Sequence, residues 1–277
     1  MSISETSLLE HTDLQRSATM SSQPQIDHVV LLLPYAMITS PPTWLTSAFT
    51  LSPGGRHADN RTENRLILFA DGSYLELIAF IDDDPKNREG HWWDKPYGIV
   101  DWALTTVTEE QPDVKEINSR LENKDSKVRY TDPVAGGRKR PDGVKLQWKV
   151  TFPTGIERGA VPFWCHDVTE REKRVPISKE GTEHPSGALG VAGLRVGIDE
   201  GRLKAVNEAV GAIIGSEDLV LGAPKEVDGL KEPWVKVQTT SGTGDVLKLE
   251  LVLQTADAGP QDIRQKVGDG EVVISFQ

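Results

Sequence analysis

The stretch DGSYLELIAF, residues 71–80, decides the fold of this chain. A turn of aspartate, glycine and serine leads into a run in which every residue from Tyr74 to Phe80 is apolar or aromatic except Glu76. A strand that is apolar on both sides is typical of a strand that is covered on both faces. An ionised carboxylate in such a place is costly unless another group compensates its charge. The stretch therefore predicts a buried strand in which Glu76 has a partner.

The composition limits the classes of partner. The chain has 277 residues, of which 37% are hydrophobic and 26% charged, as in an ordinary folded protein. Its net charge of -11 argues against nucleic acid and against an anionic membrane surface as partners. The single cysteine, Cys165, excludes an intramolecular disulfide and indicates a reducing, cytoplasmic location. No glycine loop of the phosphate-binding kind follows a strand, so we expect no nucleotide cofactor.

One order of elements recurs outward from the opening strand. The first unit, residues 26–80, predicts a strand, a short helix and three strands, and the second unit, residues 98–167, repeats this order. The tripeptide GGR occurs at residues 54–56 and again at 136–138, in loops that precede the third strand of each unit. A third unit of similar order, residues 184–277, contains an amphipathic helix that ends at Gly215 and then a pair of strands. Residues 1–24 lack apolar periodicity and are predicted to be a disordered leader.

A strand-helix-three-strand unit cannot cover both faces of its own sheet. Two such units facing each other form a cup-shaped, partly open barrel of mixed sheet, with helices outside and a cavity inside. We therefore predict an α+β fold of repeated βαβββ units, with residues 25–183 as one domain and the third unit packed on it. An inward carboxylate such as that of Glu76 then becomes a candidate site residue.

Several stretches carry a resemblance to a known family. The sequences IDHVVLLL (26–33), GGRHADNRTEN (54–64), DGSYLELIAF (71–80), RKRPDGVKLQWKV (138–150), VPFWCHD (161–167) and HPSGALGV (184–191) together resemble the glyoxalase-like domain family of the vicinal oxygen chelate superfamily. That superfamily also includes bleomycin resistance proteins and dihydroxybiphenyl dioxygenases. The resemblance implies a cup of paired units. In the members that are enzymes, it also implies a divalent metal held by a histidine of a first strand and a glutamate of a last strand.

Carried over residue by residue, the resemblance places the histidine at His28 and the glutamate at Glu76. In the second unit the first-strand place is Trp102, which cannot bind a metal. In its last strand His166 or Asp167 stands in, and His166 is the candidate third ligand. Two imidazoles and a carboxylate suit Fe, Mn, Ni or Zn. The alternative left open is a hydrogen bond or ion pair between Glu76 and a histidine or arginine of the cavity wall, without a metal.

Further candidates surround this pair. His57 follows a glycine pair and joins Glu76 and His28 as a candidate catalytic residue, while Arg56, Asn64, Arg138 and Trp148 are candidate substrate-binding residues. An arginine binds a carboxylate through two parallel hydrogen bonds, and a tryptophan wall suits a ring-bearing ligand. A solvated basic loop and a plain core tryptophan are the alternative interpretations. Cys165 is interpreted as buried and inert.

These expectations converge on a protein that binds a small organic molecule containing a carbonyl group or a ring. Lyase or isomerase chemistry with a divalent metal follows from the resemblance. A metal-free binding protein and a cofactor-free acid-base enzyme are the alternatives. We expect a monomer or a homodimer, with the small-molecule substrate as its partner.

Overall fold

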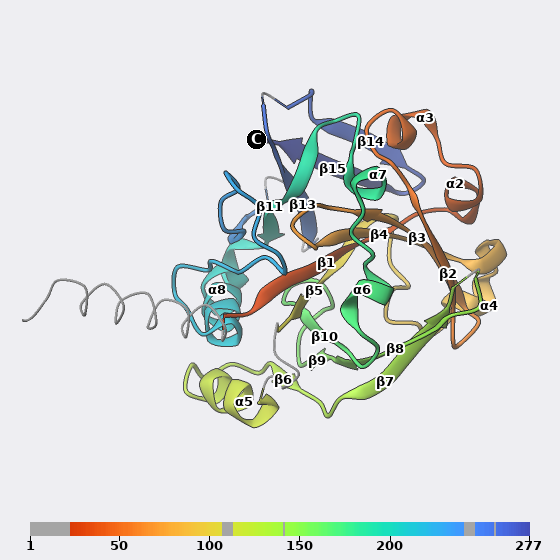
Figure 1. Cartoon of the computed structure of the whole chain (residues 1–277). Coiled ribbons are helices and arrows are strands. Elements are labelled where there is room, and N and C mark those ends of the chain that lie inside the picture. The colour runs from red at the N-terminus through yellow and green to blue at the C-terminus, as the bar shows by residue number, and fades with distance from the viewer. Residues whose placement is uncertain (1–22, 107–112, 141, 241–246, 258) are drawn as a thin grey trace, which may run out of the picture.

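The computed structural model describes residues 23–106, 113–140, 142–240, 247–257 and 259–277 (Figure 1). The predicted leader lies outside the described residues except for its last two positions. Within the described parts of the chain, no helix is long and apolar enough to cross a membrane.

Eight strands of the first two units close into a barrel. Each strand pairs with the next, and the last pairs back with the first in antiparallel orientation. The prediction of a cup built from βαβββ units in an α+β fold is confirmed. In spatial order the strands are β1 (Gln25–Leu32), β4 (Tyr74–Phe80), β3 (Thr62–Leu68), β2 (Ser52–His57), β7 (Val134–Lys139), β8 (Lys145–Thr151), β10 (Phe163–Asp167) and β5 (Gly98–Thr105).

The two GGR tripeptides lie on neighbouring strands of this barrel. They belong to β2 and β7, whose pairing sets His57 opposite Arg138. The prediction of loops at these places was wrong, because glycine here serves the close approach of neighbouring strands rather than a turn. A Cβ atom on Gly55 would lie 2.5 Å from the carbonyl oxygen of Lys139, and one on Gly136 would collide with the indole of Trp148.

The helices of the first two units are short and lie outside the barrel (Figure 1). The longest, α5 (Val114–Glu122), buries Ile117 and Leu121. It begins after Asp113, whose side chain accepts hydrogen bonds from the backbone N–H groups of Lys115 and Glu116. The other short elements are α2 (Tyr35–Thr39), α3 (Thr43–Thr46), η1 (Ile81–Asp83), α4 (Pro85–Arg88), β6 (Arg129–Tyr130), β9 (Pro153–Thr154), α6 (Arg171–Arg174) and α7 (Lys179–Thr182).

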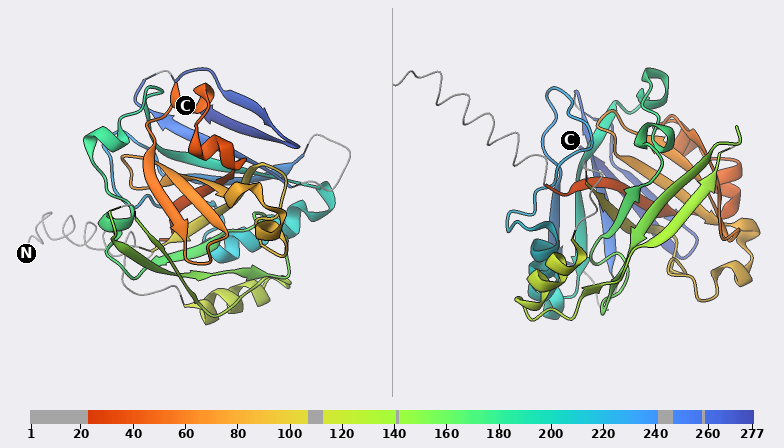
Figure 2. Two further views of the ribbon diagram at one scale, coloured as in Figure 1. Left: turned by 90° about the vertical axis from the view of Figure 1, so that its right-hand side faces the viewer. Right: turned by 60° about the horizontal axis from the view of Figure 1, so that its bottom comes forward.

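The third unit extends the sheet of the barrel. Its strand β15 meets β5 where Glu271 pairs with Gly98, and the order continues through β13 and β11 to β12. In the right-hand view of Figure 2 these teal and blue strands stand beside the orange and green strands of the barrel. The predicted pairing of β12 with β13 was wrong, because the two strands flank β11 on opposite sides. The elements are β11 (Ala188–Ile198), α8 (Glu200–Ile214), β12 (Trp234–Thr239), β13 (Lys248–Thr255), β14 (Ile263–Val267) and β15 (Gly270–Phe276).

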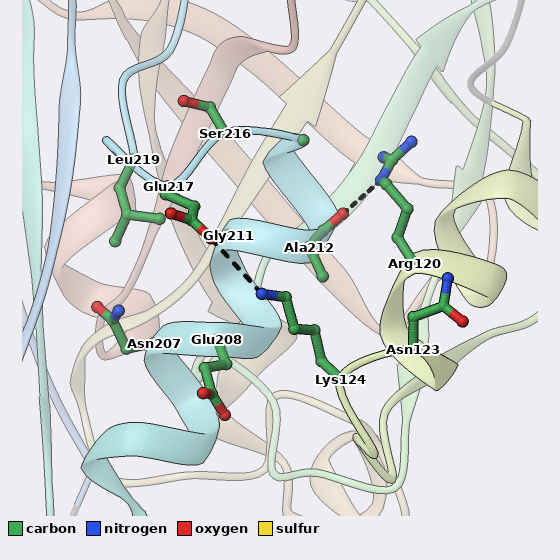
Figure 3. Close-up of a pocket in the computed structure, with 11 residues that line it drawn as sticks. Arg120, Asn123, Lys124, Asn207, Glu208, Gly211, Ala212, Ser216, Glu217 and Leu219 are labelled. Carbon is green, nitrogen blue, oxygen red and sulfur yellow. Dashed lines mark hydrogen bonds and ion pairs between the residues drawn. The ribbon is translucent and has the colours of Figure 1, made fainter.

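The helices α5 and α8 connect the second and third units. The guanidinium group of Arg120 donates hydrogen bonds to the carbonyl oxygens of Ala212, at 2.7 Å, and Ile213, at 3.2 Å. These carbonyls belong to the last turn of α8, where a cation is favourable. Figure 3 shows the adjoining pocket of about 590 Å³, in which Lys124 pairs with Glu217 at the surface. The pocket is an open groove between two helices.

The inward residues of the barrel divide into an apolar cluster and a cavity wall. Toward the C-terminal ends of β1 and β4, an inner apolar cluster is formed by Val30, Leu32, Ile78 and Phe80. The earlier inward positions of the same strands are polar and line the cavity. The barrel is therefore filled on one side and hollow on the other.

Candidate active site

A cavity of about 430 Å³ occupies the hollow side of the barrel. Its wall has two chemically different halves. The polar half comes from five successive strands, β1, β4, β3, β2 and β7, and the aromatic half comes from β8, β10 and the segments beside them. The polar half contains His28, Glu76, Asn64, His57 and Arg138, and the aromatic half contains Trp92, Trp93, Trp148, Phe152 and Phe163.

Glu76 is the centre of the polar half and is 5% exposed. Its Oε1 accepts a hydrogen bond of 2.5 Å from Asn64 Nδ2 and lies 3.5 Å from Nε2 of His57, while its Oε2 lies 3.7 Å from Nε2 of His28. Burial alone raises the pKa of Glu76, but His57, His28 and Asn64 together outweigh burial and lower that pKa to about 2. The carboxylate is therefore ionised at neutral pH.

His28 is held from behind by a fully buried acid. Its Nδ1 lies 2.6 Å from Oδ2 of Asp27, and its ring stacks on Tyr74 with 4.6 Å between the ring centroids. Because Asp27 only accepts hydrogen bonds when ionised, it fixes the proton of His28 on Nδ1. A shift of register between Ile26 and His28 in the β1–β5 pairing marks a β-bulge at this point. Nε2 of His28 is consequently the atom that faces Glu76.

Two arginines of α6 compensate the negative charge of Asp27. Arg174 donates to its two carboxylate oxygens at 2.9 and 3.0 Å, and Arg171 donates to Oδ1 at 2.5 Å. Arg174 also donates to the hydroxyl of Tyr74 and to Asp167. Although burial raises the pKa of Asp27, the two arginines hold it well below its usual range. This charged segment between the second and third units folds back and supports the cavity wall.

His57 and Arg138 face each other across the boundary between the two units. Nδ1 of His57 lies 2.7 Å from the hydroxyl of Thr62, and the ring meets Trp148 edge-on. Arg138 is 6% exposed, and its Nη1 has no hydrogen-bond partner within the described residues. Burial lowers the pKa of Arg138. An arginine with a buried, unpaired nitrogen on a cavity wall is unusual.

The structure does not bring two of the predicted residues to the cavity. Arg56 points outward and lies 3.8 Å from Glu63, with about half of its side chain exposed. His166 points away from the cavity and stacks on Trp164, where burial lowers its pKa to about 4. Successive residues of a strand point to opposite faces of the sheet. Because His57 and Cys165 point into the cavity, their neighbours Arg56 and His166 point outward. His166 therefore does not lie with His28 and Glu76 as a third ligand.

Several residues of the wall were not assigned to the site from the sequence. Asp27 sits beside His28 in an apolar strand, and Arg174 lies in a segment whose composition resembles a linker. Tyr74 and Phe163 share the inward faces of their strands with Glu76 and Cys165. The two-residue alternation is the signal that identifies these last two, whereas no local signal connects Arg174 with Asp27.

The donor groups decide which residues could hold a metal. Among the described residues, one group of three has ligand atoms within 4.8 Å of one another, namely Asp27, His28 and Cys165. This group does not fit a divalent cation, because Asp27 already accepts from two arginines and burial raises the pKa of the Cys165 thiol well above its usual range. Nε2 of His28, the Glu76 carboxylate and Nε2 of His57 fit better in donor chemistry.

Comparisons with known proteins agree with this architecture. The model of the family described as a glyoxalase-like domain matches residues 26–209. No curated protein matches the chain.

Three solved structures resemble the chain, each at low sequence identity. A hypothetical protein from Staphylococcus aureus is 13% identical with a TM-score of 0.60, and the match covers 92% of this chain and 100% of that one. A Mn(II)-bound glyoxalase from Novosphingobium aromaticivorans is 10% identical with a TM-score of 0.46, covering 91% and 81%. A mutant 4-hydroxymandelate synthase from Streptomyces coelicolor is 11% identical with a TM-score of 0.45, covering 85% and 72%. The first similarity shows a shared fold.

Proposed function

Because the chain belongs to the glyoxalase-like domain family, we propose that it is an enzyme that moves a proton on a small carbonyl compound bound inside the barrel. The reaction would be that of an isomerase or a lyase of the vicinal oxygen chelate type. The observation that carries this proposal is the position of Glu76, a buried carboxylate that faces Nε2 of two histidines within one cavity. Such convergence of titratable groups in a cleft is typical of acid-base sites.

His28 is the group best placed to accept the proton. Asp27 holds the other ring nitrogen, so Nε2 presents its lone pair to the cavity. When Nε2 takes up a proton, the imidazolium lies between the carboxylates of Asp27 and Glu76, and both favour its positive charge. Glu76, with a pKa of about 2, stays ionised and is a weak base. Its role is electrostatic, while the imidazole carries the proton.

The same residues also suit a divalent metal. His28, His57 and Glu76 would hold it, in the class of Fe, Mn, Ni or Zn, whereas His166 of the second unit faces away from the cavity. Such an ion supplies Lewis-acid polarisation of the substrate carbonyl. Asp27 would then orient the ring of His28, as carboxylates behind metal-binding histidines commonly do. A cofactor-free acid-base enzyme and a binding protein are the alternatives that remain when no metal binds.

The experiment compares the native protein with Glu76→Gln and with His166→Ala, whose side chain lies outside the cavity. Each purified protein is analysed for metals and incubated in D₂O with a panel of small aldehydes and ketones, and mass spectrometry follows deuterium uptake beside the carbonyl. We expect exchange by the native and His166→Ala proteins and a loss of about 100-fold or more in Glu76→Gln. Equal exchange by Glu76→Gln overturns the role of Glu76. No exchange by the native protein overturns the enzyme in favour of a binding protein.

Metal analysis separates the two forms of the proposal. A divalent metal in the native and His166→Ala proteins that is absent from Glu76→Gln supports the metal form. Exchange by a native protein without bound metal supports the cofactor-free form.

A further inference from the structure

Two buried arginines line the cavity, and only one of them has its charge compensated. Arg174 binds Asp27, Asp167 and Tyr74. Arg138 forms no ion pair with an acidic side chain of the described residues, and its Nη1 has no hydrogen-bond partner there. Glu76, in the same cavity, already meets Asn64 and two histidines. A buried cation without a hydrogen-bonded partner is costly, so an anion from outside the chain would stabilise Arg138 at this site.

The cavity of about 430 Å³ that Arg138 lines has room for such an anion. Gly55 stands on the neighbouring strand, and a Cβ atom there would lie 3.7 Å from Nη1 of Arg138. Gly136 and Gly137, which precede the arginine, also line the cavity. These glycines allow the close approach of their neighbours and leave no free space themselves, since a Cβ atom on Gly136 would collide with the indole of Trp148. The room for an anion is therefore that of the cavity. A planar guanidinium binds a carboxylate through two parallel hydrogen bonds.

The opposite half of the cavity is aromatic. Ring centroids follow one another from Trp92 to Phe152 at 5.2 Å, from Phe152 to Phe163 at 5.7 Å and from Phe163 to His28 at 5.4 Å. This run of rings ends at the histidine that faces Glu76. Offset and edge-to-face contacts with a flat ring are favourable at such spacings. The cavity volume of about 430 Å³ lies at the small end of ligand sites.

We propose that Arg138 is the anion-binding residue of this cavity and that its natural ligand is a small, flat, ring-bearing carboxylate. The carboxylate lies on Arg138, and the ring lies along Trp92, Phe152 and Phe163. The reacting carbon is then directed toward His28 and Glu76. The inference names the substrate class of the proposed function and rests on that function only for the reacting end of the molecule.

The test uses 3-benzoylpropanoate, which has a ring, an enolisable ketone and a carboxylate, and its primary amide, which differs in charge alone. Calorimetry measures both affinities for three full-length proteins: native, Arg138→Met and Arg140→Met. Arg140 is the matched control, because it lies just beyond β7, is partly exposed and pairs with Asp142. We expect the native protein to bind the acid at least about tenfold more tightly than the amide. Arg138→Met removes this preference, whereas Arg140→Met keeps it.

The possible outcomes separate this inference from the proposed function. Equal binding of acid and amide by the native protein, binding of neither, or an unchanged preference in Arg138→Met overturns the anion site. If Arg138→Met does not fold, Arg138→Lys replaces it in the test. A preference for the acid that is reduced by at least about fivefold in Arg138→Lys supports binding through the two parallel hydrogen bonds of arginine. An undiminished preference in Arg138→Lys overturns the anion site. An acid preference without any deuterium exchange supports the anion site while the enzyme proposal fails.

Discussion

Replacing Arg174 by methionine removes the main partner of the acid behind His28. Arg174 is 3% exposed and donates to both oxygens of Asp27, which is fully buried, as well as to Tyr74 and Asp167. Methionine retains much of the apolar stem and none of the charge. Arg171 remains beside Asp27 at 2.5 Å, although about a quarter of its side chain is exposed.

The expected loss of stability follows from this arrangement. Breaking a buried ion pair by removing one partner costs about 3–5 kcal/mol, because the other charge stays buried. Since Arg171 still compensates part of the charge on Asp27, we expect the lower end, about 3 kcal/mol. At about 2–4 °C for each kcal/mol in a chain of this size, the melting temperature should fall by roughly 6–12 °C.

Urea denaturation followed by circular dichroism at pH 7 measures the free energy of unfolding, and a thermal scan gives the melting temperature. Arg140→Met is the control, because its pair with Asp142 is partly exposed and should contribute less than about 1 kcal/mol. The double variant Asp27→Asn with Arg174→Met should lose less than the sum of the two single losses. A loss in Arg174→Met no larger than that in Arg140→Met would refute the reasoning.

Three further predictions concern other parts of the structure. Burial raises the pKa of Asp71 to about 6, only partly offset by hydrogen bonds from Ser73 and Val191, so the folded protein binds this proton more tightly than the unfolded chain does. The contribution of Asp71 to the free energy of unfolding should therefore fall by about 2 kcal/mol as the pH rises from 4 to 6. The difference between the native and Asp71→Asn urea denaturation curves measures this fall, and a difference that does not vary with pH would contradict it. Gly136→Ala should displace the indole of Trp148 at a cost of roughly 1–3 kcal/mol and change the near-UV circular dichroism, whereas an unchanged spectrum would show that the indole stays in place. His166→Ala should leave the affinity for 3-benzoylpropanoate within about twofold of the native value, because the side chain faces away from the cavity; a loss as large as that in Arg138→Met would place it at the site.

The sequence determined the repeated units and the face on which Glu76 lies. The two-residue alternation of Tyr74, Glu76, Ile78 and Phe80 is local, because it depends only on the geometry of a single strand. The end of the helix in the third unit was likewise predictable from the local sequence, since Gly215 adopts the left-handed conformation that ends the helix. These features need no knowledge of distant residues.

Only the tertiary structure decided the partners of the charged groups. Asp27 and Arg174 are 147 residues apart, and nothing in either local sequence connects them. The glycine-rich strands β2 and β7 lack apolar alternation, so their pairing, rather than their composition, set His57 and Arg138 side by side and turned Arg56 away. The register between strands that are distant in the chain decides which charged groups form ion pairs and which guanidinium group is left without a partner. That register is fixed because the apolar faces of the whole barrel must be buried together.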